Sequence, residues 1–413
     1  MSDSITHVPS EYRSTWILDT LRRTDYARLE RSGETYVDFM GGALYPESLI
    51  KVHTDFLSRS VMGNTHSVSN SSKLSLKCAD EARAAVLSFF KAPPEYTVVF
   101  TANATGALKL VGESFPFTGG SSYVLGTDSH NSIHGIREYA TYKGARVCYI
   151  QSTPNGGFDL SSAKVNNIIL RNRPRSRELA PSLFALTGQS NISNSKNPLS
   201  IIEYAAELGY STLLDAAALA PTSAFSLKEH PVDAMAISFY KMFGFPTGVG
   251  ALVVKKSFLA QLKRPWFSGG TVDVVQVPGT LVTRAHEMHE QFEAKLQPNG
   301  DMLPNSFIEY SASKQYISLR TGCMCNPGAA AAMLGIQGDM EKLYPGVTLR
   351  DFENIVGREL GVVRISFGLA SNFQDVWKVV RFAALIANER SRQELWDRWM
   401  ESKAAQASIG RAI

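Results

Sequence analysis

The sequence predicts an α/β fold with a large domain built on a mostly parallel sheet flanked by helices and a smaller α+β domain. Between about residues 51 and 264, short β-branched runs alternate with longer amphipathic stretches, which is typical of consecutive βαβ units. The chain has 413 residues, which favours two domains over one. Beyond residue 264 this alternation ends. We therefore expect the large domain over 51–264 and the smaller one over 1–50 and 265–413.

The expected strands of the large domain are short runs of β-branched and aromatic residues bounded by turn signals. In chain order they are YTVVFTA, SSYVLGT, ARVCYIQ, SLFALTG, STLLDAA, AMAISFY and GALVVKK. The helical stretches among them include GALKLVGESF, SIHGIREYATYKG and IIEYAAELGY. The smaller domain is expected to contain a helix around residues 11–24, the strand GVVRISFG and the helix QDVWKVVRFAALIANE.

Composition narrows the class of protein. Hydrophobic residues make up 44% and charged residues 19%, as in soluble globular proteins, and no apolar run is long enough to span a bilayer. The net charge of +4 is too small to indicate nucleic-acid binding. The N-terminus MSDSITHVPSEYRSTW lacks the basic and apolar segments of a secretory signal. We expect a cytoplasmic protein that binds neither nucleic acid nor a membrane.

Two of the four cysteines lie close together in RTGCMCNPGA, as Cys323 and Cys325. They are either reactive thiols or metal ligands. A cysteine-rich metal site needs a second pair of ligands, which the sequence lacks, and His286 and His289 in HEMHE miss the HExxH spacing. We therefore expect no metal.

Lys241 follows the expected strand AMAISFY and precedes a turn rich in glycine and proline. Ligands of α/β sheets bind at the carboxyl ends of the strands, so an amine there is well placed for chemistry. Neighbouring aromatic side chains would desolvate the amine and lower its pKa, which suits a nucleophile or base. The alternative is a surface lysine whose apolar stem packs on the protein.

Asp215 ends the expected strand STLLD and is followed by small residues. A carboxylate in this position can hold a proton on a ring nitrogen of a bound ligand through a charge-assisted hydrogen bond. The alternative is an aspartate that caps a helix.

Two further strand ends carry candidate residues. VVFTANATGALKL reads as strand, turn and helix, which would place Ala104 and Thr105 at a helix start that suits a phosphate. An ordinary βα connection has the same pattern. His130 follows another strand, where its ring could stack on a planar ligand or simply form hydrogen bonds in a loop.

Taken in order, these segments resemble the class V aminotransferases, and among them the N-terminal cysteine-desulfurase-like domain of eukaryotic molybdenum cofactor sulfurases. The matching strings extend over nearly the whole chain and include NTHSVSNSSKLS, YTVVFTANATGALKLVGESFPF, DSHNSIHGIREYA, GQSNIS, LLDAAA, SFYKMFGFPTGVGALVV and RTGCMCNPGA. The resemblance implies the fold of type I pyridoxal-phosphate-dependent transferases, with pyridoxal 5'-phosphate as cofactor.

The resemblance assigns roles to individual residues. Lys241 would form the Schiff base with the cofactor and Asp215 would pair with its ring nitrogen, while His130 would stack on the ring. The remaining contacts implied for the cofactor are Asn191 at the ring hydroxyl and Ala104, Thr105 and Ser238 at the phosphate. Thr271 matches a phosphate contact from a second subunit, so the resemblance implies a homodimer.

The resemblance also implies a substrate and a nucleophile. Arg364 matches the arginine that binds the substrate carboxylate. Arg320 begins an R-x-G-x-x-C pattern in which the last cysteine attacks sulfur, which makes Cys325 the expected nucleophile and Cys323 the second choice. Arg320 is the candidate that helps form the thiolate. The implied reaction takes sulfur from L-cysteine as an enzyme persulfide and releases alanine.

Three departures from the family pattern keep other functions open. The glycine expected in SNISNSKNP is Asn194, a glutamine common in bacterial desulfurases is Ala218, and YVDFMGGALYP is atypical. The sulfurases also carry a further C-terminal domain, for which 413 residues leave no room, so either a separate protein accepts the sulfur or the fold serves another reaction. The alternatives are a pyridoxal-phosphate C–S lyase or another class V reaction on a cysteine conjugate or amino acid, and a non-catalytic scaffold.

Overall fold

The chain divides into two compact units, which we describe separately. The terminal unit comprises residues 1–52, 301–323 and 343–413, and the sheet unit comprises residues 53–300 and 324–342. The computed structural model describes residues 14–62, 70–158, 163–266, 271–275, 282–284, 287–292, 306–322, 332–342, 349–356 and 362–409. The domain limits expected from the sequence stay a prediction.

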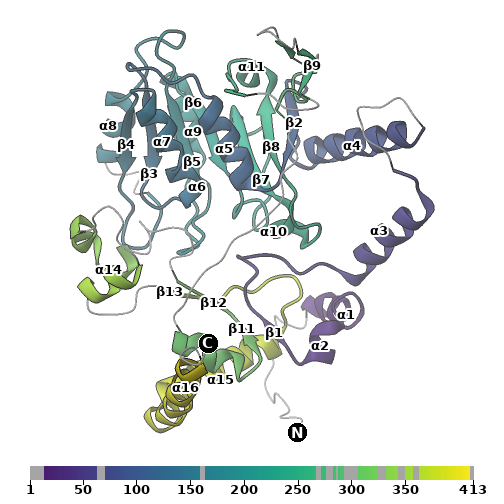
Figure 1. The fold of residues 1–413 in the computed structure, drawn as a ribbon, viewed down its shortest axis with the longest axis vertical. Coiled ribbons are helices and arrows are strands. Elements are labelled where there is room, and N and C mark those ends of the chain that lie inside the picture. The colour runs from purple at the N-terminus through teal and green to yellow at the C-terminus, as the bar shows by residue number, and fades with distance from the viewer. Residues whose placement is uncertain are drawn as a thin grey trace. The chain divides into compact units, whose positions relative to one another are not determined.

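The sheet unit is built on seven strands, each of which lies within one of the seven expected runs. They are β2 (Tyr96–Thr101), β3 (Ser122–Gly126), β4 (Arg146–Ile150), β5 (Leu183–Thr187), β6 (Ser211–Asp215), β7 (Ala234–Ser238) and β8 (Gly250–Lys255). Their order is β2-β8-β7-β6-β5-β3-β4 (Figure 1). Strand β8 runs opposite to the other six strands and is antiparallel to both β2 and β7, because the short link from β7 contains no helix long enough to cross the sheet. The mostly parallel α/β sheet is thereby confirmed.

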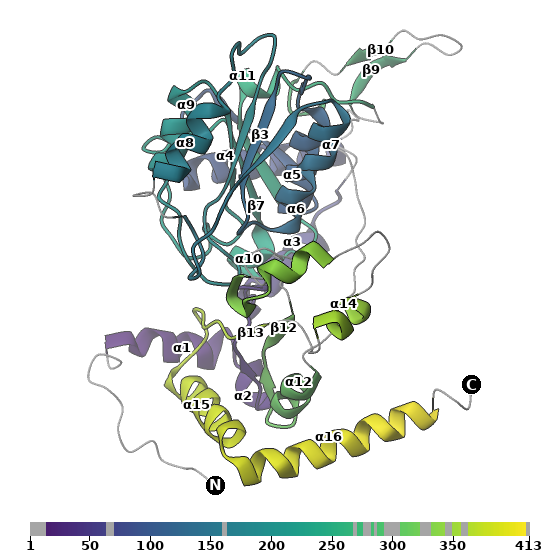
Figure 2. The same ribbon diagram turned by 90° about the vertical axis from the view of Figure 1, so that its left-hand side faces the viewer.

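Helices cover both faces of this sheet. One face packs against α5 (Ala104–Ser114), α6 (Asn131–His134) and α7 (Ile136–Tyr142), and the other against α8 (Ala163–Arg171), α9 (Ser200–Glu207) and the end of α4 (Asn70–Phe89) (Figure 2). The strands alternate between the two apolar cores: Tyr123 and Leu125 belong to one and Val124 to the other. Each fully buried large side chain stabilises the sheet unit by about 1.5–3 kcal/mol.

The remaining elements of the sheet unit are short. They are α10 (Phe239–Phe243), α11 (Lys256–Leu259), the antiparallel pair β9 (Val272–Val275) and β10 (Val282–Arg284), and the 3₁₀ helix η2 (Gln337–Lys342). Helix α3 (Glu47–Arg59) crosses the boundary between the two units. Among the described residues, no helix combines the length and apolar character required to cross a membrane.

The terminal unit combines both ends of the chain with short strand pairs. β1 (Thr35–Tyr36) runs parallel to β11 (Ile317–Ser318), and β12 (Arg320–Gly322) runs antiparallel to β13 (Val362–Arg364). Its helices are α1 (Trp16–Thr24), α2 (Arg28–Ser32), α12 (Ser306–Ser313), α14 (Leu349–Val356), α15 (Phe373–Ala387) and α16 (Glu389–Ile409).

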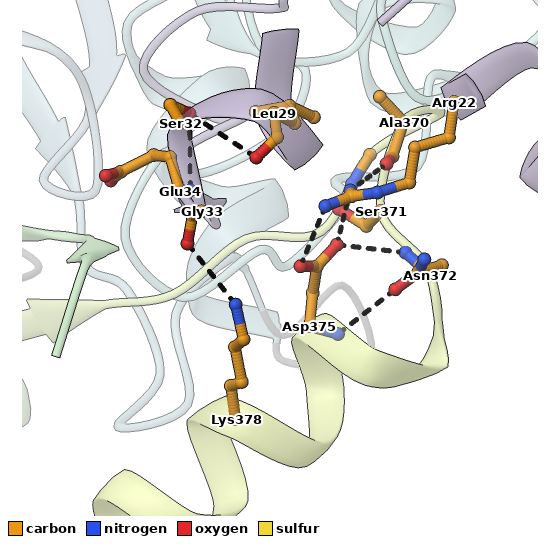
Figure 3. A network of polar contacts seen from close by, with 11 residues as sticks. Arg22, Leu29, Ser32, Gly33, Glu34, Ala370, Ser371, Asn372, Asp375 and Lys378 are labelled. Carbon is orange, nitrogen blue, oxygen red and sulfur yellow. Dashed lines mark hydrogen bonds and ion pairs between the residues drawn. The ribbon is translucent and has the colours of Figure 1, made fainter. Parts of the chain in front are cut away.

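A buried ion pair joins α1 to the start of α15 (Figure 3). Asp375 and Asn372 form a capping box, which satisfies backbone N–H groups at the N-terminus of α15. Arg22 donates hydrogen bonds to both carboxylate oxygens of Asp375, at 2.7 and 3.3 Å, and to the carbonyl oxygen of Ala370 at 2.6 Å. The first helix of the chain is therefore fixed to a segment about 350 residues later.

Candidate active site

Polar residues at the carboxyl ends of the sheet strands line one pocket. The pocket is lined by residues that end or follow β2, β3, β5, β6 and β7, namely Asn103, Ala104, Thr105, Leu108, His130, Ser132, Thr187, Gln189, Asn191, Asp215, Ala217, Ala218, Ser238, Tyr240 and Lys241. Carboxyl ends of parallel strands meet at one edge of a sheet, which explains why segments far apart in sequence converge. Every residue that we predict for the cofactor lines this pocket, with the exception of Thr271.

The turn after β2 presents the start of α5 to the pocket. Asn103 caps this helix by accepting a hydrogen bond from the Gly106 N–H at 2.9 Å. The N–H of Ala104 donates to Ser238 Oγ at 2.8 Å, which joins the helix start to the end of β7. This arrangement requires Gly250, because a Cβ atom there would lie only 2.5 Å from Asn103 Cα. The turn therefore combines backbone N–H groups, a hydroxyl and the positive end of a helix dipole.

His130 belongs to a chain of hydrogen bonds along the pocket wall. The Ser132 N–H donates to His130 Nδ1 at 3.1 Å, and Ser132 Oγ lies 2.9 Å from the same nitrogen. Ser132 Oγ is also 2.7 Å from Thr105 Oγ1, so the chain reaches the start of α5. Because Nδ1 accepts the backbone N–H, a neutral imidazole here carries its proton on Nε2.

Asp215 ends β6 inside the pocket, with only 7% of its surface exposed. Its Oδ1 accepts a hydrogen bond from the Ala217 N–H at 3.1 Å, which orients the carboxylate. The residue therefore turns the chain after β6 and also lines the pocket. A carboxylate placed in this way can hold a proton on a ligand nitrogen.

The segment after β5 is held by a network of hydrogen-bonded side chains, of which Gln189, Ser190 and Asp128 are buried. Gln189 donates to Asn194 Oδ1 and accepts from Thr222 Oγ1, while the Ser190 hydroxyl donates to Asp128 at 2.8 Å. Asn194 has a left-handed backbone with φ of 64°, a conformation that favours glycine and that asparagine tolerates. This explains how an asparagine can replace the expected glycine.

Lys241 lies in α10, directly after β7, and is partly exposed. Gly244 ends this short helix in a left-handed conformation, and the Gly244 N–H donates to the Tyr240 carbonyl oxygen. Tyr240 lines the pocket beside the lysine. Phe239 packs against Phe100, and this contact supports the base of the turn. The lysine is thus held on a fixed turn at the pocket edge.

The predicted residues outside the pocket lie in several places. Thr271 is fully buried within its own chain, beside β9. Arg320 and Arg364 belong to the terminal unit, where their Cα atoms are paired across β12 and β13. Arg364 forms an ion pair with Asp38, with Nη2 and Oδ1 2.6 Å apart. Cys323 and Cys325 lie outside the described residues.

The pocket also contains residues that the sequence reasoning missed. Asn103, Leu108, Ser132, Thr187, Gln189 and Ala217 line it without having been assigned a role. A weak signal existed for three of these, since Ser132 follows His130 by two residues and Thr187 and Gln189 lie at the end of an expected strand. Across the described ranges, histidine, cysteine, aspartate and glutamate do not gather in any group of three or more that could hold a metal ion.

Comparison with known proteins gives a family match over most of the chain. The aminotransferase class-V family matches residues 35–294. Molybdenum cofactor sulfurase of Arabidopsis thaliana is 29% identical over 88% of this chain and 57% of that protein. The Bos taurus protein of the same name is 32% identical over 88% of this chain and 51% of its own length. The chain therefore spans little more than half the length of these relatives.

Solved structures share the fold. Cysteine desulfurase from Thermococcus onnurineus NA1 superposes with a TM-score of 0.69 at 19% identity, covering 89% of this chain and 97% of that one. Cysteine desulfurase CsdA from Escherichia coli gives 0.66 at 18% identity, covering 91% and 98%. The expected type I fold is thereby confirmed.

Proposed function

Because this chain belongs to the aminotransferase class-V family, we propose that it is a pyridoxal-phosphate-dependent cysteine desulfurase. It takes sulfur from L-cysteine as a persulfide on Cys325 and releases alanine. The observation that carries the proposal is the pocket at the carboxyl ends of the strands, where Asp215, His130 and Lys241 meet the start of α5. Relatives described as molybdenum cofactor sulfurases, at about 30% identity, support the choice of sulfur chemistry.

The residues of the pocket fit pyridoxal 5'-phosphate. The phosphate would be held by Ala104, Thr105 and Ser238, where backbone N–H groups, hydroxyls and the helix dipole combine. Asn191 would bind the ring hydroxyl. The buried Asp215 carboxylate would hold a proton on the ring nitrogen, and the His130 ring would stack on the cofactor.

Each step of the proposed reaction falls to a particular residue of the chain. The bound cofactor supplies a ring that takes up the electron pair left when the Cα–H bond of the substrate breaks. The Lys241 amine removes that proton, which it can do as a base at the pocket edge. Arg364 binds the substrate carboxylate. The Cys325 thiolate attacks the substrate sulfur, so that an S–S bond forms as the Cβ–S bond breaks. The electron pair of the broken bond stays on the substrate, which takes up protons at Cα and Cβ and leaves as alanine.

Three further parts of the proposal concern partners and location. The protein acts as a homodimer, the assembly in which the resemblance assigns Thr271 of one subunit to the phosphate site of the other; in the single chain Thr271 is fully buried. A separate protein accepts the persulfide sulfur. The reaction takes place in the cytoplasm, in keeping with the sequence expectation.

The test is to incubate the purified protein, loaded with pyridoxal phosphate, with L-cysteine and to measure alanine and protein-bound persulfide. We expect equal amounts of the two in the first turnover, and loss of persulfide in Cys325→Ser. Cys323→Ser is the matched control and should keep its persulfide. Pyruvate and ammonia in place of alanine would sink the desulfurase proposal and indicate a C–S lyase. Loss of persulfide in Cys323→Ser alone would move the nucleophile to that cysteine.

A further inference from the structure

Asp38 contacts Arg364 in the terminal unit, and the proposed mechanism assigns no role to Asp38. The Arg364 guanidinium donates through Nη2 to Asp38 Oδ1 at 2.6 Å. The arginine side chain is only 8% exposed and the aspartate side chain 22% exposed. Water and salt therefore screen this charge-assisted hydrogen bond far less than they screen a surface pair.

The backbone places Asp38 beside the strand that carries Arg364. Asp38 and Ser366 form a parallel β-bridge, and the Ser366 N–H donates to the Val37 carbonyl oxygen at 2.5 Å. The Met40 N–H donates to Ser366 Oγ at 2.9 Å. Ser366, two residues beyond Arg364, is thus hydrogen-bonded to the residues on both sides of Asp38. The backbone therefore fixes the position of the Asp38 carboxylate.

The turn after Asp38 is held by hydrogen bonds to the Asp38 backbone carbonyl oxygen, and its Gly41 lies against the carboxylate. The N–H groups of Gly41 and Gly42 donate to the Asp38 carbonyl oxygen at 2.9 and 3.1 Å. A Cβ atom at Gly41 would lie 2.3 Å from Asp38 Oδ2, so only glycine leaves room for this carboxylate. The Tyr36 hydroxyl also donates to the carbonyl oxygens of Asp38 and Gly42. The atypical segment YVDFMGG is therefore shaped to hold Asp38 in one place.

We infer that Asp38 is a positioning residue for the substrate carboxylate, acting through Arg364. A flexible arginine loses rotamer freedom when it binds a ligand, whereas an arginine already held by Asp38 has lost much of it beforehand. The ion pair with Asp38 is made through Nη2, and it fixes the plane of the guanidinium, whose parallel N–H donors suit a carboxylate. This inference rests on the proposed function, in which Arg364 binds the substrate carboxylate.

Two ligands that differ in the carboxylate alone provide the test. L-alanine carries it, and ethylamine lacks it. Both are titrated into the cofactor-loaded enzyme, and binding is followed by the absorbance of the cofactor, which does not depend on turnover. In Asp38→Ala we expect the Kd for L-alanine to rise by about tenfold, equivalent to 1.4 kcal/mol, while the Kd for ethylamine stays unchanged.

The variants include a graded replacement and a control. Asp38→Asn keeps the shape and one acceptor oxygen, so its Kd for L-alanine should lie between those of the wild type and Asp38→Ala, and it serves if the alanine variant does not fold. Glu47→Gln removes other ion pairs of the terminal unit, those of Glu47 with Arg28 and Arg31, and should change neither Kd. With L-cysteine as substrate, KM should rise more than kcat falls in both Asp38 variants.

Two outcomes would overturn the inference. Equal weakening of both ligands would show that Asp38 only supports the fold. Tighter binding of L-alanine would show that Asp38 competes with the substrate for Arg364. Arg364→Lys separates these failures from failure of the proposed function. If Arg364→Lys abolishes the preference for L-alanine while Asp38→Ala leaves the Kd for L-alanine unchanged, the inference alone fails. If Arg364→Lys also keeps the preference, the proposed role of Arg364 fails together with the inference.

Discussion

Asp215 illustrates how a single residue acquires two roles at a strand end. Its Oδ1 accepts the Ala217 N–H at 3.1 Å, a contact that any aspartate at a turn could make. The same side chain is almost fully buried and lines the pocket, which a simple cap does not require. A buried carboxylate needs a partner, because an unpaired charge in an apolar setting is costly. A protonated ring nitrogen would be such a partner.

Asp215→Asn should therefore bind the cofactor more weakly and lose most activity. Removing a charge-assisted hydrogen bond costs roughly 1.5–3 kcal/mol, which corresponds to a ten- to hundredfold weaker Kd for pyridoxal phosphate. Cofactor titration measures the first effect, and alanine release the second. Asp233→Asn is the matched control, since Asp233 lies at the start of β7 and pairs with Lys255. Equal effects of the two substitutions would contradict the role of Asp215.

The partly buried His134 should make the free energy of unfolding depend on pH. Burial lowers the pKa of the His134 imidazole below its ordinary value of 6.5, and nearby Arg137 lowers it further. The unfolded chain therefore binds a proton more readily than the folded one, so stability falls as the pH drops below about 6.5. His134→Gln removes this contribution. The difference in Tm between wild type and variant should be larger at pH 7.5 than at pH 5, whereas a constant difference would contradict the prediction.

Among the elements, the contact between α5 and β8 fixes the end of the pocket to which we assign the cofactor phosphate. The helix begins at Ala104, and its cap Asn103 lies against Gly250 at the start of β8. The sequence indicates the strand, the turn and the helix, since the pattern VVFTANATGALKL is local. It does not indicate the contact with Gly250, which lies almost 150 residues later and depends on the order of the strands.

Gly250→Ala should push the start of α5 away from Ser238. The added Cβ would meet Asn103 and the Ile237 carbonyl oxygen at 2.5 Å, and overpacking of this kind costs about 1–3 kcal/mol. We expect a Kd for pyridoxal phosphate that is at least roughly tenfold weaker, measured by fluorescence titration. Gly338→Ala is the control, because its Cβ would find open space. An unchanged Kd in Gly250→Ala would show that this contact does not shape the site.

The ion pair between Arg22 and Asp375 should make α1 essential to the terminal unit. Arg22→Met leaves a buried carboxylate without its partner, which destabilises a protein by about 3–5 kcal/mol. Urea unfolding followed by tryptophan fluorescence measures the loss, because Trp377, Trp396 and Trp399 belong to this unit. Glu47→Gln, which breaks a surface pair, should cost less than about 1 kcal/mol. Similar losses in both variants would contradict the buried pair as a main support.

For the molecule as a whole, the sequence predicts the sheet more completely than it predicts the site. Periodicity and turn residues locate all seven strands, because each strand is a local pattern of buried side chains. The family resemblance adds the residues at strand ends, and the pocket contains most of them. Gln189, Ser132 and Asp38 were missed, because their roles come from hydrogen bonds to residues distant in sequence or from small loop contacts.

The central claim is that the pocket at the carboxyl ends of the strands binds pyridoxal phosphate through Lys241. The most direct test is to load the protein with the cofactor, reduce it with borohydride and locate the pyridoxyl group by peptide mass spectrometry. We predict a single modified lysine, Lys241, and no modification there in Lys241→Ala. Lys228→Ala, a substitution of an exposed lysine, should leave the labelled peptide unchanged. A label on another lysine, or none in a folded protein, would contradict the claim.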